Sequence, residues 1–413
     1  MAKRALVITF LFLVVFTVSA EDFSDYYGNA SSYFSDPNTG LTVFPILKLP
    51  LGGRALGMGT AYTAVTLDSG ALTSNPAATA LLPLTELSLI HNNWIADSSL
   101  EGIAFTRRFG NLGIGAAGQY LHIPFTAYDA WGETSAAARI SEGVALLNLS
   151  YNFFSSYNFS GVSLGTNLKA AFRVVPTLLY EDQSLFSGMA DLGILTRFNF
   201  LKPYSSRDKN FSLGASVKNL GLAAKEDPLP SLFSAGFAYS PFRPLLLAFD
   251  YNLPFVLDPD IPSEKWYLSG GANLEVTPFF SAQTGFSYGG ANPRISVGSV
   301  LDLQDISILV NYTLDLTTQA RAFDRFSLEA KMSLGDEGRA ETSRLVDAYY
   351  LAGLEAYAAG ETDTALQYWK AAIRLDPTYE PAVEFLQTLT MTLQMYAQME
   401  AMNRLRDDNE PLQ

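Results

Sequence analysis

The sequence predicts an all-β transmembrane barrel of about 14 antiparallel strands, and three observations favour this class. Hydrophobic residues make up 48% of the 413-residue chain and charged residues only 16%, so the chain has few charges with which to cover its apolar material. Residues 86–334 alternate between apolar and polar positions with the period of two that is typical of strands. The predicted connections are mostly short and long in turn, as in outer-membrane barrels.

Residues 1–20 have the order of a secretory signal peptide. Lys3 and Arg4 precede an apolar run that ends in Val18-Ser19-Ala20. A membrane anchor is the alternative, but the run is shorter than the about 20 residues that a spanning helix needs. We expect cleavage after Ala20 and export of the mature chain.

Composition excludes several classes of function. The chain has no Cys, which excludes disulfides and thiolate metal sites, and its net charge of −14 argues against a nucleic-acid partner. His91 and His122 are the only histidines, and neither has the spacing of a metal site. The sequence also lacks a phosphate loop, a dinucleotide fingerprint and a nucleophile elbow. It therefore predicts no enzyme, no cofactor and no metal.

The clearest strands lie near the end of the alternating region. In "FSLEAKMSL", residues 326–334, Glu329 and Lys331 share the polar face, which a membrane barrel turns toward its lumen. A soluble sandwich would instead turn that face to water, and it stays open as the alternative. The expected strands cover residues 86–96, 100–109, 111–122, 141–154, 161–175, 188–200, 210–219, 231–240, 244–253, 265–276, 279–289, 293–302, 305–315 and 324–334.

The expected connections alternate with two exceptions. The third, fifth, seventh and ninth are long, whereas the second, eighth, tenth and twelfth are tight. The sixth, "LKPYSSRDKN", is longer than the pattern prefers and the eleventh, "GGAN", is shorter. Because an even number of strands places both barrel ends on one side, which is the periplasm in outer-membrane barrels, we expect a periplasmic carboxyl terminus.

The composition changes after Gly335. Residues 341–413 contain 12 acidic and 5 basic residues and have a helical pattern. Their small and large residues have the spacing of one tetratricopeptide repeat. The residues in that pattern are Tyr349, Gly353, Ala356, Ala365, Trp369, Ala372 and Pro377. Ala352 and Ala356 depart from it, since the repeat usually has larger residues there, and an ordinary helical tail is the alternative. Tyr350, Leu354 and Tyr357 are candidates for docking a periplasmic protein, although simple packing explains them equally well.

The segment before the first strand has the composition of a plug. Residues 51–83, "LGGRALGMGTAYTAVTLDSGALTSNPAATALLP", are rich in Gly and Ala, so their backbone can approach other backbone closely inside a lumen. Pro76 holds Asn75 extended, and the Asn75 amide can satisfy turn groups where water is scarce. The predicted organisation is a signal peptide (1–20), an amino-terminal extension and hatch (21–85), the barrel (86–334) and a periplasmic helical domain (341–413).

Residues 51–334 resemble the FadL-type long-chain fatty-acid transporter family, including its spirochaete members, some of which carry tetratricopeptide-like tails. The resemblance rests on the hatch residues Gly52, Gly57, Gly59, Asn75, Pro76 and Ala77 ahead of a strand array. It implies that the chain transports long-chain fatty acids or similar hydrophobic molecules through a plugged barrel in the outer membrane. The amino-terminal extension, residues 21–50, is longer than expected for that family.

In the FadL family an inward kink of the third strand opens the wall sideways. The corresponding candidates here are Gly113, Gly115 and Gly118, although a weakly specified strand of small residues fits equally well. The long third and fifth connections supply candidates for capturing a ligand at the outer surface, or alternatively part of an aromatic girdle. These are Phe125, Tyr128, Trp131, Leu178, Leu179, Tyr180, Leu185 and Phe186.

The sequence thus predicts a transporter whose partners are a hydrophobic small molecule, the outer membrane and a periplasmic protein that binds the tail. One alternative is an outer-membrane anchor or scaffold whose working part is the tail. Another is a porin for hydrophilic solutes, which would require a polar, open lumen.

Overall fold

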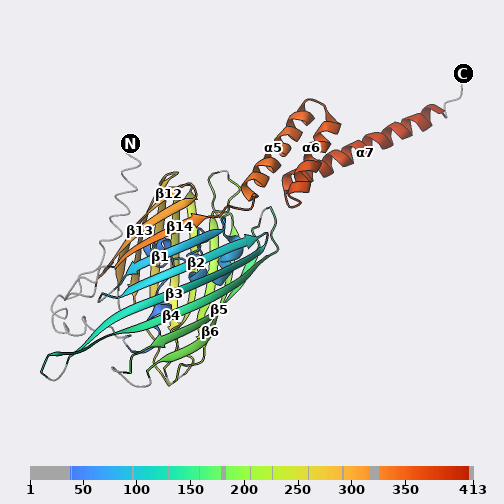
Figure 1. Ribbon diagram of the computed structural model, residues 1–413. Helices are drawn as coiled ribbons and strands as arrows, with labels where there is room; N and C mark the ends of the chain where they lie inside the picture. Colours follow the sequence, from blue (N-terminus) through green and yellow to red (C-terminus); the bar gives the residue numbers. More distant parts are fainter. Residues whose placement is uncertain are drawn as a thin grey trace, which may run out of the picture.

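In the residues that the structure describes, fourteen antiparallel strands form a closed barrel (Figure 1). The computed structural model describes residues 38–408 except 39, 95–96, 129–130, 158, 178–182, 205, 226, 259, 291–292 and 317–324. The predicted signal peptide lies outside the described residues, and the predicted fold class is confirmed. The strands are β1 (Glu86–Asn93), β2 (Ser99–Phe109), β3 (Leu112–Tyr128), β4 (Thr134–Phe153), β5 (Val162–Val174), β6 (Leu185–Phe198), β7 (Phe211–Gly221), β8 (Ser231–Phe242), β9 (Leu245–Phe255), β10 (Tyr267–Thr277), β11 (Phe280–Gly289), β12 (Arg294–Leu303), β13 (Ile306–Asp315) and β14 (Arg325–Ser333).

The first and last strands close the barrel. β1 pairs with β14 from Glu86 opposite Ser333 to Asn93 opposite Phe326, without a register shift. Closure gives each described strand a partner on both sides along the wall, so the backbone there is satisfied without water. This is the condition for a sheet to sit in lipid.

The two faces of the wall differ in polarity. On β4, Leu147 is 66% exposed while the next residue, Asn148, is 6% exposed. The alternation places apolar side chains outside and polar ones inside, which is the pattern of a membrane-spanning barrel. Glu329 and Lys331, which were expected on the lumenal face, are buried in the interior.

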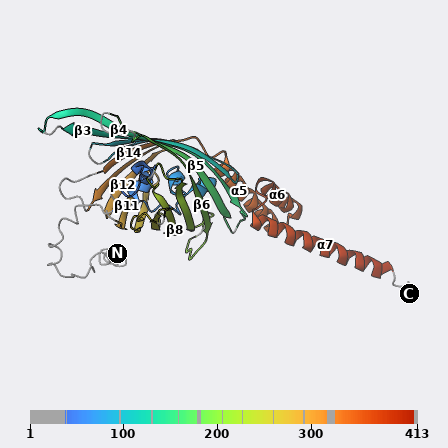
Figure 2. The same cartoon turned by 90° about the horizontal axis from the view of Figure 1, so that it is seen from below.

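β3 and β4 are longer than the sequence predicts. The expected third connection, residues 123–140, is mostly strand, because residues 123–128 pair with residues 134–140. This hairpin extends beyond the other strands (Figures 1 and 2). Its sequence lacks alternation because most of its described residues are exposed on both faces, so the pattern that marks strands elsewhere is absent there.

A segment ahead of β1 fills the barrel interior. Its elements are the 3₁₀ turn η1 (Pro45–Lys48), the short helices α3 (Gly53–Gly57) and α4 (Ala71–Ser74), and the 3₁₀ helix η2 (Pro76–Leu81). Figure 1 shows them in blue between the walls. Most of their residues are buried between the strands. We call residues 51–83 the hatch, and their role as a plug stays a prediction.

Three helices follow β14, namely α5 (Arg339–Ala358), α6 (Thr362–Leu375) and α7 (Glu380–Asp408). Trp369 of α6 is fully buried against α5, where a Cβ added to Gly353 would lie 2.3 Å from the indole nitrogen. The small residue therefore lets the two helices pack closely. The tetratricopeptide character of this helical domain stays a prediction.

The helical domain packs against the even-numbered connections of the barrel. Arg207, in the sixth connection, lies 3.6 Å from Asp347 and 3.7 Å from Asp376, and its guanidinium sits 4.9 Å from the centre of the Tyr379 ring. Tyr157, in the fourth connection, meets the same ring edge-on at 5.2 Å. The long sixth connection thus reaches this domain.

Tyr379 is the centre of that contact. Its hydroxyl donates a 3.2 Å hydrogen bond to Asp347. Burial raises the pKa of the Tyr379 hydroxyl and the neighbouring carboxylate raises it further, so the phenol stays neutral and remains a donor.

Among the described residues, no helix has both the length and the apolar character that a membrane span requires.

We predict that Gly353→Val separates α5 from α6. The added side chain would overlap Trp369, at a cost of about 1–3 kcal/mol for overpacking. The thermal midpoint of the helical circular-dichroism signal should fall, while the heat-modifiable migration of the barrel on gels stays unchanged. Ala358→Val, at an exposed position of the same helix, is the control. An unchanged midpoint for Gly353→Val would contradict this packing.

Candidate functional site

The Asn75-Pro76-Ala77 turn of the hatch is held by hydrogen bonds to the hatch itself and to the barrel wall. The Asn75 side-chain oxygen accepts a 3.1 Å hydrogen bond from the Ala77 amide, which caps η2. The Asn75 amide nitrogen donates to the carbonyls of Thr63, at 2.8 Å, and Ile194, at 3.1 Å. One side chain therefore ties the turn to itself, to the rest of the hatch and to β6.

Polar side chains of the wall also form hydrogen bonds with this part of the hatch. Asn148 of β4 donates to the Pro76 carbonyl at 3.0 Å, and Ser163 of β5 donates to the Ala77 carbonyl at 2.6 Å. Ser216 of β7 donates to a third hatch carbonyl at 3.1 Å. Because the turn has few backbone partners of its own, these donors are what satisfies it in a buried setting.

Wall glycines let the turn come this close. A Cβ on Gly193 would lie 2.1 Å from the Asn75 side-chain oxygen, and one on Gly165 would lie 2.3 Å from the Pro76 carbonyl oxygen. Both distances are too short for non-bonded atoms, so only glycine fits. The turn thus rests directly on the backbone of β5 and β6.

The other predicted hatch residues also make close approaches. A Cβ on Gly52 would meet the Cα of Gly70 at 2.7 Å, and one on Gly59 would meet the β11 backbone at 2.5 Å. A Cβ on Gly57 would lie 2.3 Å from the side-chain oxygen of Gln283. These three glycines allow the hatch to pack closely on its own backbone and on β11.

Charged groups also anchor the hatch. Asp68 pairs with Arg54 of α3 at 2.9 Å and also with Lys331 of β14. Glu329 of β14 accepts a 2.6 Å hydrogen bond from the amide of a hatch glycine, and Glu86 of β1 accepts one of 2.8 Å from the Ser69 amide. Asp250 of β9 accepts two further hatch amides at 2.8 and 2.9 Å. Carboxylates on three strands thus take the place of water for the hatch backbone.

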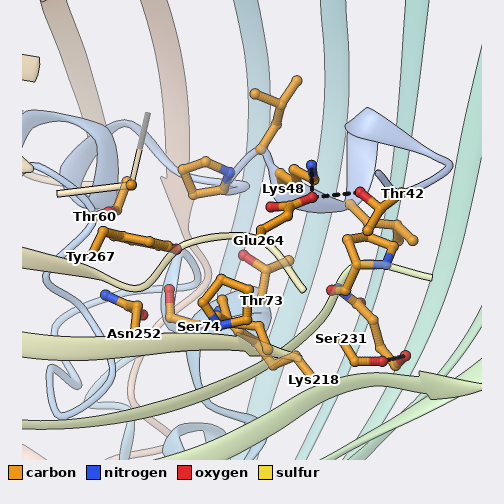
Figure 3. Close-up of a pocket in the computed structure, with 18 of the residues that line it drawn as sticks. Thr42, Lys48, Thr60, Thr73, Ser74, Lys218, Ser231, Asn252, Glu264 and Tyr267 are labelled. Atoms are coloured by element: carbon orange, nitrogen blue, oxygen red, sulfur yellow. Dashed lines mark hydrogen bonds and ion pairs between the residues drawn. The ribbon is translucent and has the colours of Figure 1, made fainter. Parts of the chain in front are cut away.

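A cavity of about 190 Å³ lies between the hatch and the chain that precedes it (Figure 3). The hatch contributes Thr60, Thr63, Thr73 and Ser74, and the preceding segment contributes Leu47, Lys48, Leu49 and Pro50. The barrel wall supplies both apolar and polar groups, among them Val144, Leu146, Lys218, Ser231 and Asn252. We call this space the lumenal cavity.

Lys218 of β7 gives the lumenal cavity a cation. Its ammonium group makes no hydrogen bond and no ion pair with the residues that the structure describes. The neighbouring Lys169 differs, since it pairs with Asp191 at 2.6 Å and donates to Asn219 at 2.9 Å. Lys218 can therefore bind an anionic group that enters the cavity.

The candidates for ligand capture do not gather in one place. Phe125, Tyr128 and Trp131 lie on the extended β3–β4 hairpin and are exposed, Trp131 to 88%. Leu178, Leu179 and Tyr180 lie outside the described residues. Leu185 is buried inside the barrel, whereas the next residue, Phe186, is 72% exposed on the outside. Their role stays a prediction.

The glycines of β3 have two different surroundings. Gly113 and Gly115 face inward, where added Cβ atoms would meet the hatch backbone at 2.4 Å and the Leu72 side chain at 2.6 Å. Gly118 has only a single side-chain atom and a carbonyl oxygen near 4 Å. β3 stays paired with β2 and β4 through all three glycines, so the wall is continuous here.

The tail candidates take part in packing within the helical domain. Tyr350 lies 5.4 Å from Tyr379 and 6.0 Å from Phe385, measured between ring centres. Leu354 packs against the same core, while Tyr357 is 48% exposed beside Trp369. Docking of a partner at these residues stays a prediction.

Several site residues were not singled out from sequence, namely Lys218, Asp250 and the wall glycines. Lys218 had no signal of its own in the sequence, because charged side chains are ordinary on the lumenal face of a membrane barrel. The described residues contain no cluster of three side chains that could hold a metal ion.

Residues 28–337 match the model of UPF0164, described as an uncharacterised protein family. The chain belongs to the UPF0164 family. A UPF0164 protein of Treponema pallidum (strain Nichols) is 27% identical over 386 residues, covering 90% of this chain and 88% of the relative. A second one from that strain is 24% identical over 391 residues, covering 86% and 76%.

Solved structures with a similar arrangement include the Pseudomonas putida toluene transporter TodX. It has a TM-score of 0.47 and 13% identity, over 69% of this UPF0164 chain and 97% of TodX. The CymD monoaromatic hydrocarbon channel also has a TM-score of 0.47 and 13% identity, over 69% of this chain and 98% of CymD.

We predict that Gly193→Val displaces the Asn75 turn and raises the leak conductance of the barrel in planar bilayers. The overlap with Asn75 would cost about 1–3 kcal/mol, and the hatch can relieve it only by leaving the wall. Replacing Asn75 and Pro76 together with Ala should have the same effect. Gly188→Val, on the same strand with open space around it, should leave the conductance unchanged. Equal conductance in all four proteins would reduce the motif to a folding turn.

Proposed function

We propose that this UPF0164 protein transports hydrophobic small molecules, foremost long-chain fatty acids, across the outer membrane. The lumenal cavity carries the proposal, because it lies against the hatch and combines apolar wall residues with Lys218, whose ammonium group makes no hydrogen bond or ion pair with the described residues. A ligand with an apolar chain and an anionic head group matches both features. The resemblance to FadL-type transporters implies that transport runs inward, toward the periplasm.

The proposed location is the outer membrane, with the helical domain in the periplasm. The apolar exterior and the closed wall support a membrane-spanning barrel. The helical domain contacts the even-numbered connections, which lie at the end of the barrel where the first strand begins and the last strand ends. In barrels of this kind that end faces the periplasm.

The proposed exit is sideways, through the wall near β3. An apolar depression of about 780 Å³ lies on the outer face there, lined by Gly118, Ala145 and Ala170 beside larger apolar residues. Small residues on both faces of β3 leave room for the strand to bend once the hatch moves. A ligand leaving at this point would enter an apolar environment directly.

A second candidate function is that of an anchor for a periplasmic protein. Its support is α7, which extends away from the barrel (Figures 1 and 2) and exposes Met391, Met395, Tyr396 and Met399. Exposed methionines are common at adaptable binding surfaces. In this case the helical domain would be the working part.

We predict that palmitate binds the detergent-purified protein and that Lys218→Met weakens this binding about tenfold, or about 1.4 kcal/mol. Hexadecanol, which has the same chain without the charge, should bind both proteins equally. Lys370→Met, at an exposed position of the helical domain, is the control. Calorimetry that detects neither palmitate nor hexadecanol would contradict the transporter.

Deletion of residues 341–413 separates the two functions. The barrel closes without the helices, so we expect the truncated protein to bind palmitate with an affinity within roughly tenfold of the full chain. A scaffold should bind no palmitate in either form and should lose its partner with the deletion.

A further inference from the structure

A second cavity, of about 100 Å³, lies at the end of the lumen from which the even-numbered connections emerge. Hatch residues 64–67 cover one side of it, and β6 to β10 with their connections form the other. Among the described residues, this cavity shares no lining residue with the lumenal cavity. The same hatch therefore borders two separate spaces.

Three basic side chains line this second cavity. Arg197 comes from β6, Lys209 from the connection between β6 and β7, and Arg243 from the turn between β8 and β9. Glu275 is the one carboxylate among the described residues that line it. The lining thus has an excess of positive charge, although the whole chain has a net charge of −14. We call this space the basic pocket, and its charge favours an anion.

Arg197 has hydrogen-bond donors that no protein group uses. Its Nε atom is buried and has no partner in the described part of the chain. One terminal nitrogen donates to the Lys209 carbonyl at 3.4 Å, which is a long hydrogen bond. A guanidinium group presents its N–H donors in a planar fork that matches the oxygens of a phosphate or a carboxylate. An acceptor in the basic pocket would therefore offset the cost of burying this N–H group.

Uncharged groups around the basic pocket also have donors to offer. The side-chain oxygen of Asn273 accepts hydrogen bonds from Arg54 at 3.3 Å and from Gln283 at 3.1 Å, whereas its nitrogen has no acceptor among the described residues. The backbone amides of Thr66 and Leu67 likewise donate to no described residue. Because buried N–H groups are nearly always paired, these donors indicate an acceptor that the protein itself does not supply.

The basic groups at this end of the lumen repel one another. Burial lowers the pKa of the Lys209 ammonium, and the positive charges of Lys202 and Arg197 lower it further, while Asp208 raises it. Lys209 is kept in this position by a 2.8 Å hydrogen bond to the Tyr157 carbonyl. An anion placed between these cations would reduce their repulsion.

We propose that the basic pocket binds a small dissolved oxyanion of the phosphate class, which links hatch residues 64–67 to the barrel wall. A phosphate group carries roughly −1.5 to −2 charges near pH 7, which suits three bases and one carboxylate better than the single charge of a fatty acid. A cavity of about 100 Å³ is also too small for a long acyl chain, since sites for drug-sized ligands have about 300–1,000 Å³. This inference goes beyond the proposed transport and does not depend on it.

Calorimetry with inorganic phosphate tests the basic pocket in the detergent-purified full chain at low salt. We expect one saturable site with a dissociation constant below about 1 mM. Arg197→Met should weaken phosphate binding about tenfold, because it removes the charged fork of donors. Arg344→Met, at an exposed position of α5, is the matched control and should leave the affinity unchanged. Arg243→Met replaces Arg197→Met if the latter fails to give a heat-modifiable barrel.

Cysteine labelling locates the bound anion, because the chain has no Cys of its own. Thr66→Cys places a thiol at the basic pocket, and Thr73→Cys places one at the lumenal cavity. Phosphate at about ten times its dissociation constant should slow the labelling of residue 66 by a neutral methanethiosulfonate about tenfold. The labelling of residue 73 should not change.

A lack of saturable phosphate binding would overturn the basic pocket as an anion site, and so would equal affinity in Arg197→Met and the unmodified chain. Protection of residue 73 instead of residue 66 would also overturn it. Competition between palmitate and phosphate at residue 66 would assign the pocket to the carboxylate of a transported ligand, which overturns this inference and leaves the proposed function intact. Protection of residue 66 by phosphate in a chain that binds no palmitate would support the pocket and contradict the proposed function.

Discussion

The structure depends on hydrogen bonds between the polar inner face of the barrel and the irregular segment that fills it. The hatch has only short helical turns, so many of its backbone N–H and C=O groups have no partner within the segment. The inner face of a membrane barrel is polar because its outer face must be apolar. Wall carboxylates such as Asp250 and Glu329 accept hatch amides, and wall amides such as Asn148 donate to hatch carbonyls. The wall and the hatch thus supply each other with the hydrogen-bond partners that both lose when water is excluded.

This arrangement holds the two parts of the lumenal segment in different ways. The Asn75 turn lies on wall backbone at Gly165 and Gly193 and is bound by side chains from several strands. Residues 41–50 are held by apolar contacts with the wall and by hydrogen bonds that involve Glu142, Glu264, Gln119 and the Pro228 carbonyl. The turn therefore depends on close backbone approach, whereas the residues ahead of it depend mainly on side-chain burial.

The barrel could be predicted from sequence because alternation reports directly on a wall with two different faces. That signal fails where a strand leaves the wall, which is why the β3–β4 extension appeared as a loop. The polar residues of the Asn75 turn are local in sequence and could be recognised. The wall glycines that the turn contacts, Gly165 and Gly193, lie about 90 and 118 residues after Asn75 in the sequence. Nothing local distinguishes them from other strand glycines. The burial of Phe44 and Ile46 also escaped prediction, because a short apolar segment without periodicity does not reveal what it packs against.

The position of the helical domain has a mechanical consequence. Arg207 and Tyr157 hold it to the connections that join β4 to β5 and β6 to β7. These four strands also carry Asn148, Ser163, Gly193 and Ser216, on which the Asn75 turn rests. A pulling force applied along α7 would therefore reach the barrel by two routes, through the covalent link to β14 and through the contacts of Arg207 and Tyr157. The second route ends on the strands that hold the Asn75 turn, so tension on the helical domain would load the wall around the hatch.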